Sequence, residues 1–369
     1  MESRDDGRAA MRAIGVAAIA LIGLAFSLLP VAERLDAALL DLEWRLLRQF
    51  HSRPAAEDIV IVGVDEASVR AIPEPPGLWH ASLGRALTRI SAARPRAIGF
   101  ALPLPERSYD GVKAGVDRAL FEGLATAVET TPFVASLSID ARTRGARNIH
   151  LPFLALLGES RLGIDLTARD VDGVARRFSL LVPTEDGGFP TIEGRLCRAM
   201  KRQCTDGLIH YSLGRPFTYV PLKNLLAMSD ERRLEGLFRD RIVLIGEALA
   251  YTDRIEVPVN YAGWEGEERN SPGIVVHAQT LRTALAGAAP QDASRPAIVL
   301  LLTLAALVFL VREPRMAALA AALVAVGVIV AAVLMLRGGL FLPASAAIFT
   351  ALLALGARLV VARRARKAP

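Results

Sequence analysis

The chain has 369 residues, of which 52% are hydrophobic and only 22% are charged, and its mean hydropathy is +0.35. That average is too apolar for most soluble enzymes and predicts a membrane protein. The net charge of +6 could indicate nucleic-acid binding, but residues 33–295 carry 33 Lys and Arg against 34 Asp and Glu. The positive excess lies outside that segment, so nucleic-acid binding loses its main support.

Four apolar runs with almost no charge predict four transmembrane helices. They cover residues 13–32, 296–311, 316–336 and 340–361. A spanning helix needs about 20 apolar residues; the second run is shorter, but Arg312 and Pro314 supply a tight turn before the third. The first run could instead be a cleaved signal peptide. Its length favours a retained anchor, because the apolar core of a signal peptide has about 7–15 residues.

Basic residues flank these runs unevenly and predict the topology. They are Arg4, Arg8 and Arg12 before the first run, Arg312 and Arg315 between the second and third, and Arg363, Arg364, Arg366 and Lys367 after the fourth. The positive-inside rule then places residues 1–12 and the basic tail 362–369 in the cytoplasm. Residues 33–295 are predicted to form one domain on the periplasmic or extracellular side of a bacterial inner membrane.

The segment 33–295 alternates between β-branched apolar runs and helical patterns. Strands are predicted at 58–64, 97–102, 132–139, 178–183 and 241–246, and helices at 83–93, 112–128, 190–202 and 276–286. This alternation favours an α/β domain with a largely parallel inner sheet. The predicted fold class is therefore an extracytoplasmic α/β domain joined to four transmembrane α-helices.

The only two cysteines, Cys197 and Cys204, lie in this outer segment. A pair of cysteines in an oxidising compartment favours a disulfide. Residues seven apart in a straight helix are about 10.5 Å apart, which is too far to bridge. A disulfide therefore requires the helix to end near residues 201–203, and two free thiols are the alternative. No metal site is predicted, because the five histidines are scattered.

Five polar residues near predicted strand ends or helix starts are candidates for contact with a ligand. They are Asp65, Glu66, His80, Asp253 and His277. Open α/β sheets bind ligands at such positions. The alternatives are structural: Asp65 could cap the following helix, and an isolated histidine often has a packing role. No phosphate-binding loop, dinucleotide fingerprint, zinc-protease motif or nucleophile elbow is present, so we expect neither a cofactor nor enzymatic activity.

Five motifs, in order, resemble the second class of CHASE domain, an extracytoplasmic sensor associated with cyclases and histidine kinases. They are IVIVGVDEAS (59–68), RAIGFAL (96–102), DVDGVARRFSLL (170–181), IVLIGEALAYTD (242–253) and PGIVVHAQTLRTALAG (272–287). The resemblance covers roughly residues 35–287, and the layout of one apolar run before the domain and three after it is similar to the family's. It implies a sensor that detects a small molecule or a protein.

The chain also departs from the family pattern. Residues 75–80 read PPGLWH where the family has a Trp-Pro-Trp-Pro-Arg-like stretch, and Gly99-Phe100-Ala101 replaces Gly-Phe-Asp, which removes an acidic residue. Family members usually continue into a cytoplasmic catalytic domain, whereas eight residues follow Val361 here. We therefore expect an orphan sensor that passes its signal to a separate membrane or cytoplasmic partner.

Two other functions stay open at this point. An envelope scaffold that docks a partner without sensing a ligand would fit the loss of the acidic residue. An extracytoplasmic enzyme has less support, because no nucleophile–base pair is recognisable in the sequence. Faces of small alanine residues in the last two apolar runs allow close helix contacts, either within the chain or in a homodimer.

Overall fold

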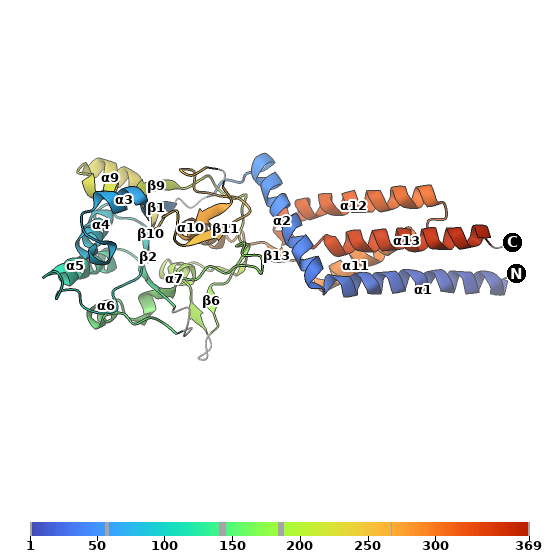
Figure 1. Cartoon of the computed structure of the whole chain (residues 1–369), viewed down its shortest axis with the longest axis horizontal. Helices are drawn as coiled ribbons and strands as arrows, with labels where there is room; N and C mark the ends of the chain where they lie inside the picture. The colour runs from blue at the N-terminus through green and yellow to red at the C-terminus, as the bar shows by residue number, and fades with distance from the viewer. Residues whose placement is uncertain (1, 56–58, 140–144, 184–187, 267, 368–369) are drawn as a thin grey trace. The chain divides into compact units, whose positions relative to one another are not determined.

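The computed structural model describes residues 2–55, 59–139, 145–183, 188–266 and 268–367. The chain folds as two compact units (Figure 1): His51–Ala289 form one, and Met1–Phe50 together with Pro290–Pro369 form the other. The segment 33–50, which we expected in the outer domain, belongs to helix α2 (Pro30–Phe50) and to the second unit. We call the units the α/β unit and the helical unit.

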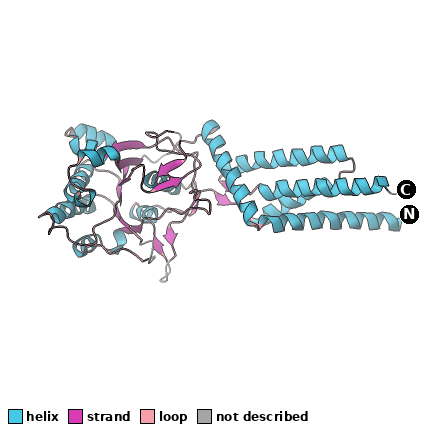
Figure 2. Ribbon diagram, in the orientation of Figure 1, coloured by secondary structure: helices cyan, strands magenta, loops and turns pink. Residues whose placement is uncertain are grey.

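A six-stranded sheet forms the centre of the α/β unit (Figure 2), and all of its strand pairs are parallel. The strand order is β4-β3-β2-β10-β1-β9. The strands are β1 (Ile59–Val64), β2 (Ala97–Ala101), β3 (Phe133–Leu137), β4 (Leu162–Ile164), β9 (Thr218–Pro221) and β10 (Ile242–Glu247). The prediction of a parallel inner sheet is confirmed. Position 58 of the first predicted strand lies outside the described residues.

The predicted strand at 178–183 does not join this sheet. Phe178 belongs to β5 (Arg177–Phe178), which pairs with β8 (Gly207–Leu208), and β6 (Leu181–Val182) pairs with β7 (Phe189–Pro190). Both pairs are antiparallel. The residues of this segment therefore belong to two short two-stranded pairs, of which only β6–β7 is a local hairpin. The large sheet takes β4 and β9 at its edges, which the sequence pattern did not predict.

Helices cover both faces of the sheet. The buried cluster on one face joins the strands to α4 (His80–Ala92), α5 (Val116–Thr130), α6 (Leu151–Leu157), α8 (Leu222–Ala227) and α9 (Glu231–Phe238). α7 (Ile192–Ala199) and α10 (Gly273–Leu285) cover the other face, where a Cβ added at Gly99 of β2 would meet Leu196 of α7. Burying both faces explains why β1 and β2 are almost continuously apolar.

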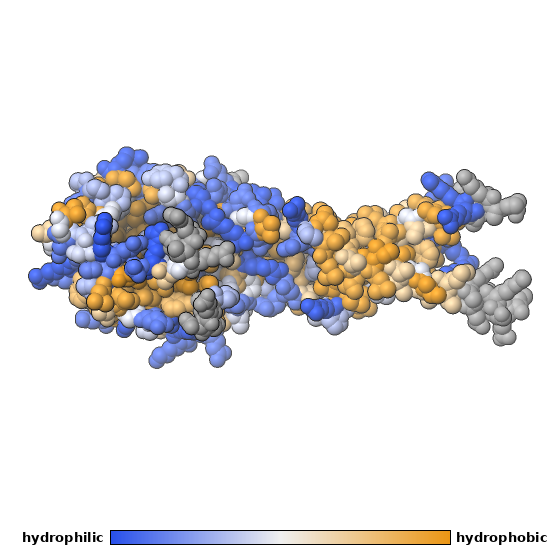
Figure 3. Space-filling view, turned by 60° about the horizontal axis from the view of Figure 1, so that its bottom comes forward, coloured by the Kyte–Doolittle hydropathy of each residue, from blue (hydrophilic) through white to orange (hydrophobic). Residues whose placement is uncertain are grey.

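Three helices of the helical unit are long and apolar enough to cross a membrane. They are residues Ala10–Ser27 of α1 (Glu2–Ser27), α12 (Pro314–Arg337), and Ser345–Arg364 of α13 (Ser345–Lys367). Figure 3 shows a broad apolar surface over this unit. Such a surface is expected where lipid, and not water, surrounds the helices.

The prediction of four spanning helices is wrong in its second member. Instead of one helix over 296–311, α11 (Arg295–Ala306) is followed by a 3₁₀ helix, η3 (Leu307–Leu310). An α-helix of that length rises only about 18 Å, against about 30 Å for the apolar core of a membrane. The described chain therefore has three candidate spanning helices and one shorter apolar helix.

The short α11–η3 segment still packs along the spanning helices. It contacts α1 and α13. Near its start, β13 (Gln291–Asp292) pairs with β14 (Leu340–Phe341), just before α13. Past its end, the carbonyl of Val311 accepts a hydrogen bond from Arg358 near the end of α13 (2.8 Å). The two ends of this segment therefore lie at opposite ends of α13, and Figure 1 places both chain termini at the Arg358 end.

Candidate functional site

A small acidic hollow lies at the carboxyl edge of the parallel sheet. Ala101 ends β2, Asp165 directly follows β4, and Glu247 ends β10. These three residues line a hollow of about 160 Å³ together with Pro103, Asp253, Ile274 and His277. Because the carboxyl ends of parallel strands meet at one edge, residues far apart in the sequence converge here. We call this hollow the acidic pocket.

Among the described residues that line the acidic pocket, His277 is the basic side chain, and two carboxylates contact it. Its Nδ1 lies 2.5 Å from Glu193 and its Nε2 lies 2.8 Å from Asp165. Ionised carboxylates only accept hydrogen bonds, so both ring nitrogens carry a proton and the ring is an imidazolium. Burial alone would lower the pKa of His277, but Glu193 and Asp165 together raise it well above its usual value of 6.5.

The start of α10 positions both His277 and Asp253. His277 lies four residues after Gly273, the first residue of α10, and so projects from the same side of the helix. The Gly273 amide donates to the Asp253 carbonyl at 2.8 Å, and a Cβ at Gly273 would lie 1.9 Å from Oδ2 of Asp253. Only glycine lets the Asp253 carboxylate approach this helix N-terminus, where the helix dipole favours a negative charge.

The start of α7 positions Glu193 in the same way. Thr191 caps α7 by accepting a hydrogen bond from the Gly194 amide (3.2 Å), which fixes Glu193 in the first turn. Glu193 and His277 also line a second hollow of about 170 Å³, with apolar walls that include Phe178 and Leu181. The His277–Glu193 pair thus borders both an acidic and a mainly apolar space.

The predicted residues Asp65 and Glu66 lie outside the acidic pocket and make structural contacts. Asp65 caps α3 (Glu66–Ala71) by accepting from the Ser68 amide at 2.7 Å, and it also accepts from the Tyr219 hydroxyl at 3.1 Å. Glu66 accepts from the Ala250 amide at 2.6 Å. The helix-cap alternative for Asp65 is therefore confirmed.

The predicted residue His80 lies on the other face of the sheet. It begins α4, and its Nδ1 lies 3.0 Å from Asp117 of α5. It lines a separate hollow with residues of α4, α5 and the loop after β2. The structure thus brings together Asp253 and His277 of the five predicted ligand residues, and it separates the other three from them.

Cys197 and Cys204 form a disulfide with a Cα–Cα distance of 6.3 Å. The helix ends before Cys204, as the bridge requires, but earlier than the predicted residues 201–203: α7 stops at Ala199, and Lys201 has a φ of 55° in the left-handed region. This break brings Cys204 back toward the helix that carries Cys197. The same helix carries Glu193, so the disulfide anchors the helix that supplies Glu193 to the contact with His277.

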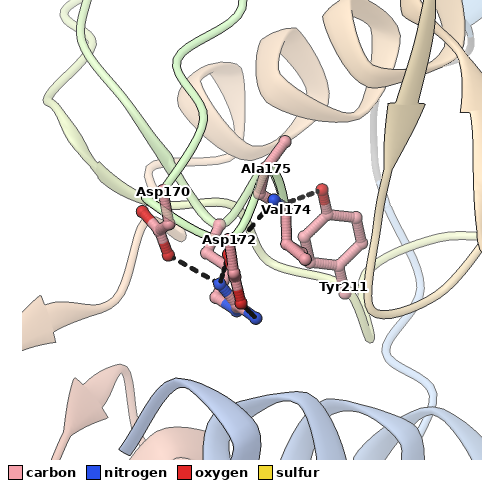
Figure 4. A network of polar contacts seen from close by, with 6 residues as sticks. Asp170, Asp172, Val174, Ala175 and Tyr211 are labelled. Atoms are coloured by element: carbon pink, nitrogen blue, oxygen red, sulfur yellow. Dashed lines mark hydrogen bonds and ion pairs between the residues drawn. The ribbon is translucent and has the colours of Figure 1, made fainter. Parts of the chain in front are cut away.

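The DVDGVARR stretch forms a tight turn around Arg176 (Figure 4). Arg176 donates to Asp170 at 2.9 Å and to Asp172 at 2.8 Å, and its side chain is 2% exposed. The Tyr211 hydroxyl donates to the neighbouring Ala175 carbonyl at 2.7 Å. Gly173 adopts a φ of 85°, which favours glycine. These contacts make the motif a structural element and not a ligand site.

A family model for the CHASE2 domain matches residues 16–312. The chain belongs to the CHASE2 domain family. The resemblance seen in the sequence motifs is thereby confirmed, and the match extends beyond residues 35–287 to include residues 16–27 of α1 and the whole of α11 and η3. Neither the curated proteins nor the solved structures contain a match to this chain. The protein is thus a CHASE2 sensor-type domain combined with membrane-spanning helices.

One departure from the family pattern, Ala101, lies in the acidic pocket. The resemblance of the sequence motifs implies an acidic side chain at this position, where this chain has alanine. The departure from the family pattern therefore alters the pocket itself. Asp165, Glu247 and Asp253 supply its carboxylates here.

Sequence reasoning missed Asp165, Glu193 and Glu247. Glu247 had a usable signal, because it ends a clear apolar strand. Asp165 follows a strand of only three residues, which is too short to show a period. Glu193 lies inside a helix whose pairing with His277 depends on the packing of α7 against α10.

Proposed function

We propose that this CHASE2 protein is a signal-input protein of the bacterial inner membrane. Its α/β unit detects a small molecule in the periplasm, and a separate partner carries the output. Membership of a sensor-type family and three candidate membrane-spanning helices support this proposal.

The charge of the acidic pocket indicates the class of ligand. Four carboxylates, those of Asp165, Glu193, Glu247 and Asp253, surround or adjoin the imidazolium of His277. Burial raises the pKa of Asp253, and the positive charges of His277, Arg169 and Arg254 oppose this shift. The surplus negative charge favours a cationic ligand that donates hydrogen bonds, such as a primary amine. A volume of about 160 Å³ suits a small molecule. This surplus of carboxylates is the observation that carries the proposal.

The charges of the helical unit support a cytoplasmic position for both termini. Arg312 and Arg315 follow η3, at the end where Arg358 of α13 binds the Val311 carbonyl. Arg363 and Arg364 follow in α13 at the same end. Concentration of arginines at one end of the unit favours a cytoplasmic location for that end, which leaves the α/β unit outside.

Signal transfer would use α10. This helix carries His277 near its start and ends at Leu285, only a few residues before β13 and α11. A ligand that binds one arrangement of the α10 N-terminus more tightly than another shifts the population of the two states. The covalent path from α10 into the helical unit then lets that shift reach the membrane helices and a partner protein, or a second copy of this chain.

The test is thermal unfolding of the full-length protein in nanodiscs, with ethanolammonium or propylammonium as the probe and acetate as the control anion. A ligand that binds only the native state stabilises it by about 2.7 kcal/mol at a hundredfold excess over Kd. We expect a stabilisation that is lost in Asp253→Asn. The result would favour an envelope scaffold if neither amine changes the melting temperature and if in-cell crosslinking of the protein recovers only envelope proteins.

A further inference from the structure

Another hollow in the α/β unit, on the opposite face of the sheet from α10, is large enough for an organic molecule. Its volume is about 430 Å³, within the range of about 300–1,000 Å³ that is usual for small-molecule pockets. Phe100, Leu104 and Leu120 supply part of its apolar wall, and His80 and Tyr109 supply polar groups. We call it the His80 pocket.

Asp117 fixes the His80 ring in one orientation. Its carboxylate accepts hydrogen bonds from His80 Nδ1 (3.0 Å), the Ser108 hydroxyl (2.6 Å) and the Tyr109 amide (2.9 Å). Desolvation opposes ionisation of Asp117, but these hydrogen bonds together lower its pKa. An ionised carboxylate requires a proton on Nδ1 of His80, and the tautomer is thereby set.

This arrangement leaves Nε2 of His80 available as an acceptor. The side chain is only 6% exposed, and burial lowers the pKa of His80 despite the neighbouring Asp117. The ring is therefore neutral near pH 7, with a lone pair on Nε2. Within the described residues, Nε2 has no hydrogen-bond partner, and the ring borders the His80 pocket. Nε2 is not among the fully buried atoms that lack a partner, so this acceptor is accessible to a ligand or to water.

The rim of the His80 pocket adds a positive charge. Arg107 and Arg147 both line it, and Glu106 lies 3.7 Å from Arg147. The negative charge of Glu106 can neutralise one guanidinium, so the rim keeps a net positive charge. The pocket thus combines an apolar wall, an accessible histidine acceptor and a cationic rim.

We propose that the His80 pocket is a second small-molecule site of this protein, which binds an organic acid that has an apolar body and a hydroxyl or N–H donor. The donor bonds to Nε2 of His80, the body packs on Phe100 and Leu120, and the carboxylate faces the arginines of the rim. This site is separate from the acidic pocket, which favours a cation, although Pro103 in the loop after β2 borders both. One loop thus connects two sites of opposite charge preference.

The experiment measures binding of 3-(4-hydroxyphenyl)propionate to the full-length protein in nanodiscs by equilibrium dialysis, with empty nanodiscs as the blank. The analogue 3-phenylpropionate lacks only the hydroxyl, so we expect it to bind about tenfold more weakly, which corresponds to one lost hydrogen bond. His80→Asn keeps a donor toward Asp117 but lacks Nε2. It should bind the two compounds equally.

A steric variant provides an independent check. A Cβ added at Gly77, which lines the pocket, meets no atom within 4 Å, so Gly77→Phe should fold and fill the pocket. The matched control is Gly236→Phe, because Gly236 also opens onto free space but lies on α9, away from this pocket. Binding should be lost in the first variant and unchanged in the second.

Three results would overturn the assignment: no binding of the hydroxy acid to the native protein, an unchanged preference between the two acids in His80→Asn, or full binding in Gly77→Phe. The result is independent of the function proposed for the acidic pocket. Asp253→Asn removes the amine response there and should leave acid binding in the His80 pocket intact.

Discussion

Replacement of His277 by glutamine tests whether the buried imidazolium stabilises the α/β unit. In the native protein, His277 separates Glu193 and Asp165, and the Glu193 side chain is only 5% exposed. His277→Gln preserves roughly the size and one donor but removes the positive charge. Glu193 then keeps a buried negative charge without its cation. Breaking a buried ion pair in this way costs about 3–5 kcal/mol.

The loss should be visible as a lower melting temperature. For domains of about 150–250 residues, each kcal/mol shifts Tm by about 2–4 °C, so His277→Gln should lower Tm by about 6–20 °C. Two of the three tryptophans, Trp79 and Trp264, lie in the α/β unit. Tryptophan fluorescence of the full-length protein in nanodiscs therefore reports mainly on this unit.

The pH dependence separates a charge effect from a packing effect. Because the folded-state pKa of His277 is raised, its stabilisation is fully present below the unfolded value of about 6.5 and is lost as the pH rises through the folded-state value. His277→Gln should lack this decline. The double variant His277→Gln/Glu193→Gln should recover part of the loss, because it leaves no buried charge at Glu193. A cost below about 1 kcal/mol, or additive effects of the two substitutions, would refute the ion-pair explanation.

Three further changes test other parts of the structure. Gly273→Ala should displace Asp253 from the α10 N-terminus at a cost of about 1–3 kcal/mol and should abolish any amine-dependent Tm shift, whereas retention of that shift would exclude Asp253 from the site. Arg176→Met should lower the free energy of unfolding, measured with denaturant, by only about 1–2 kcal/mol, since its acidic partners are partly hydrated. A decrease above 4 kcal/mol would show that the DVDGVARR turn stabilises more of the protein than the turn itself. Reduction of Cys197–Cys204, or Cys197→Ser/Cys204→Ser, should lower stability by about 2–3 kcal/mol for so short a loop, and an unchanged Tm under reducing conditions would contradict this.

Sequence patterns predicted the α/β class because they arise within single elements. A strand such as β1 is recognisable from six consecutive buried apolar residues, and alternation with amphipathic helices implies parallel pairing. The position of β10 between β1 and β2 was not predictable, because non-local strand order depends on packing of the whole sheet. The segment 178–183 was misassigned for a similar reason: its residues pair with β7 and β8 in two small antiparallel sheets outside the six-stranded sheet.

The membrane segments show the same limit. Hydropathy identified three spanning helices correctly, since length and composition suffice when every backbone group must bond within one helix. It overestimated the segment 296–311, because composition does not reveal that the α-helix gives way to a 3₁₀ turn at Leu307.

The sequence by itself determined the CHASE2 family, the parallel α/β core, the place where the disulfide helix had to end, and the helix-capping capacity of Asp65. These properties depend on local spacing, backbone preference or motif order. Only the tertiary structure decided which polar residues act together. Glu193, Asp165 and Asp253 come from separate parts of the chain and meet His277 because α7 and α10 pack on one face of the sheet. His80 faces a different partner and a different pocket because α4 packs on the other face.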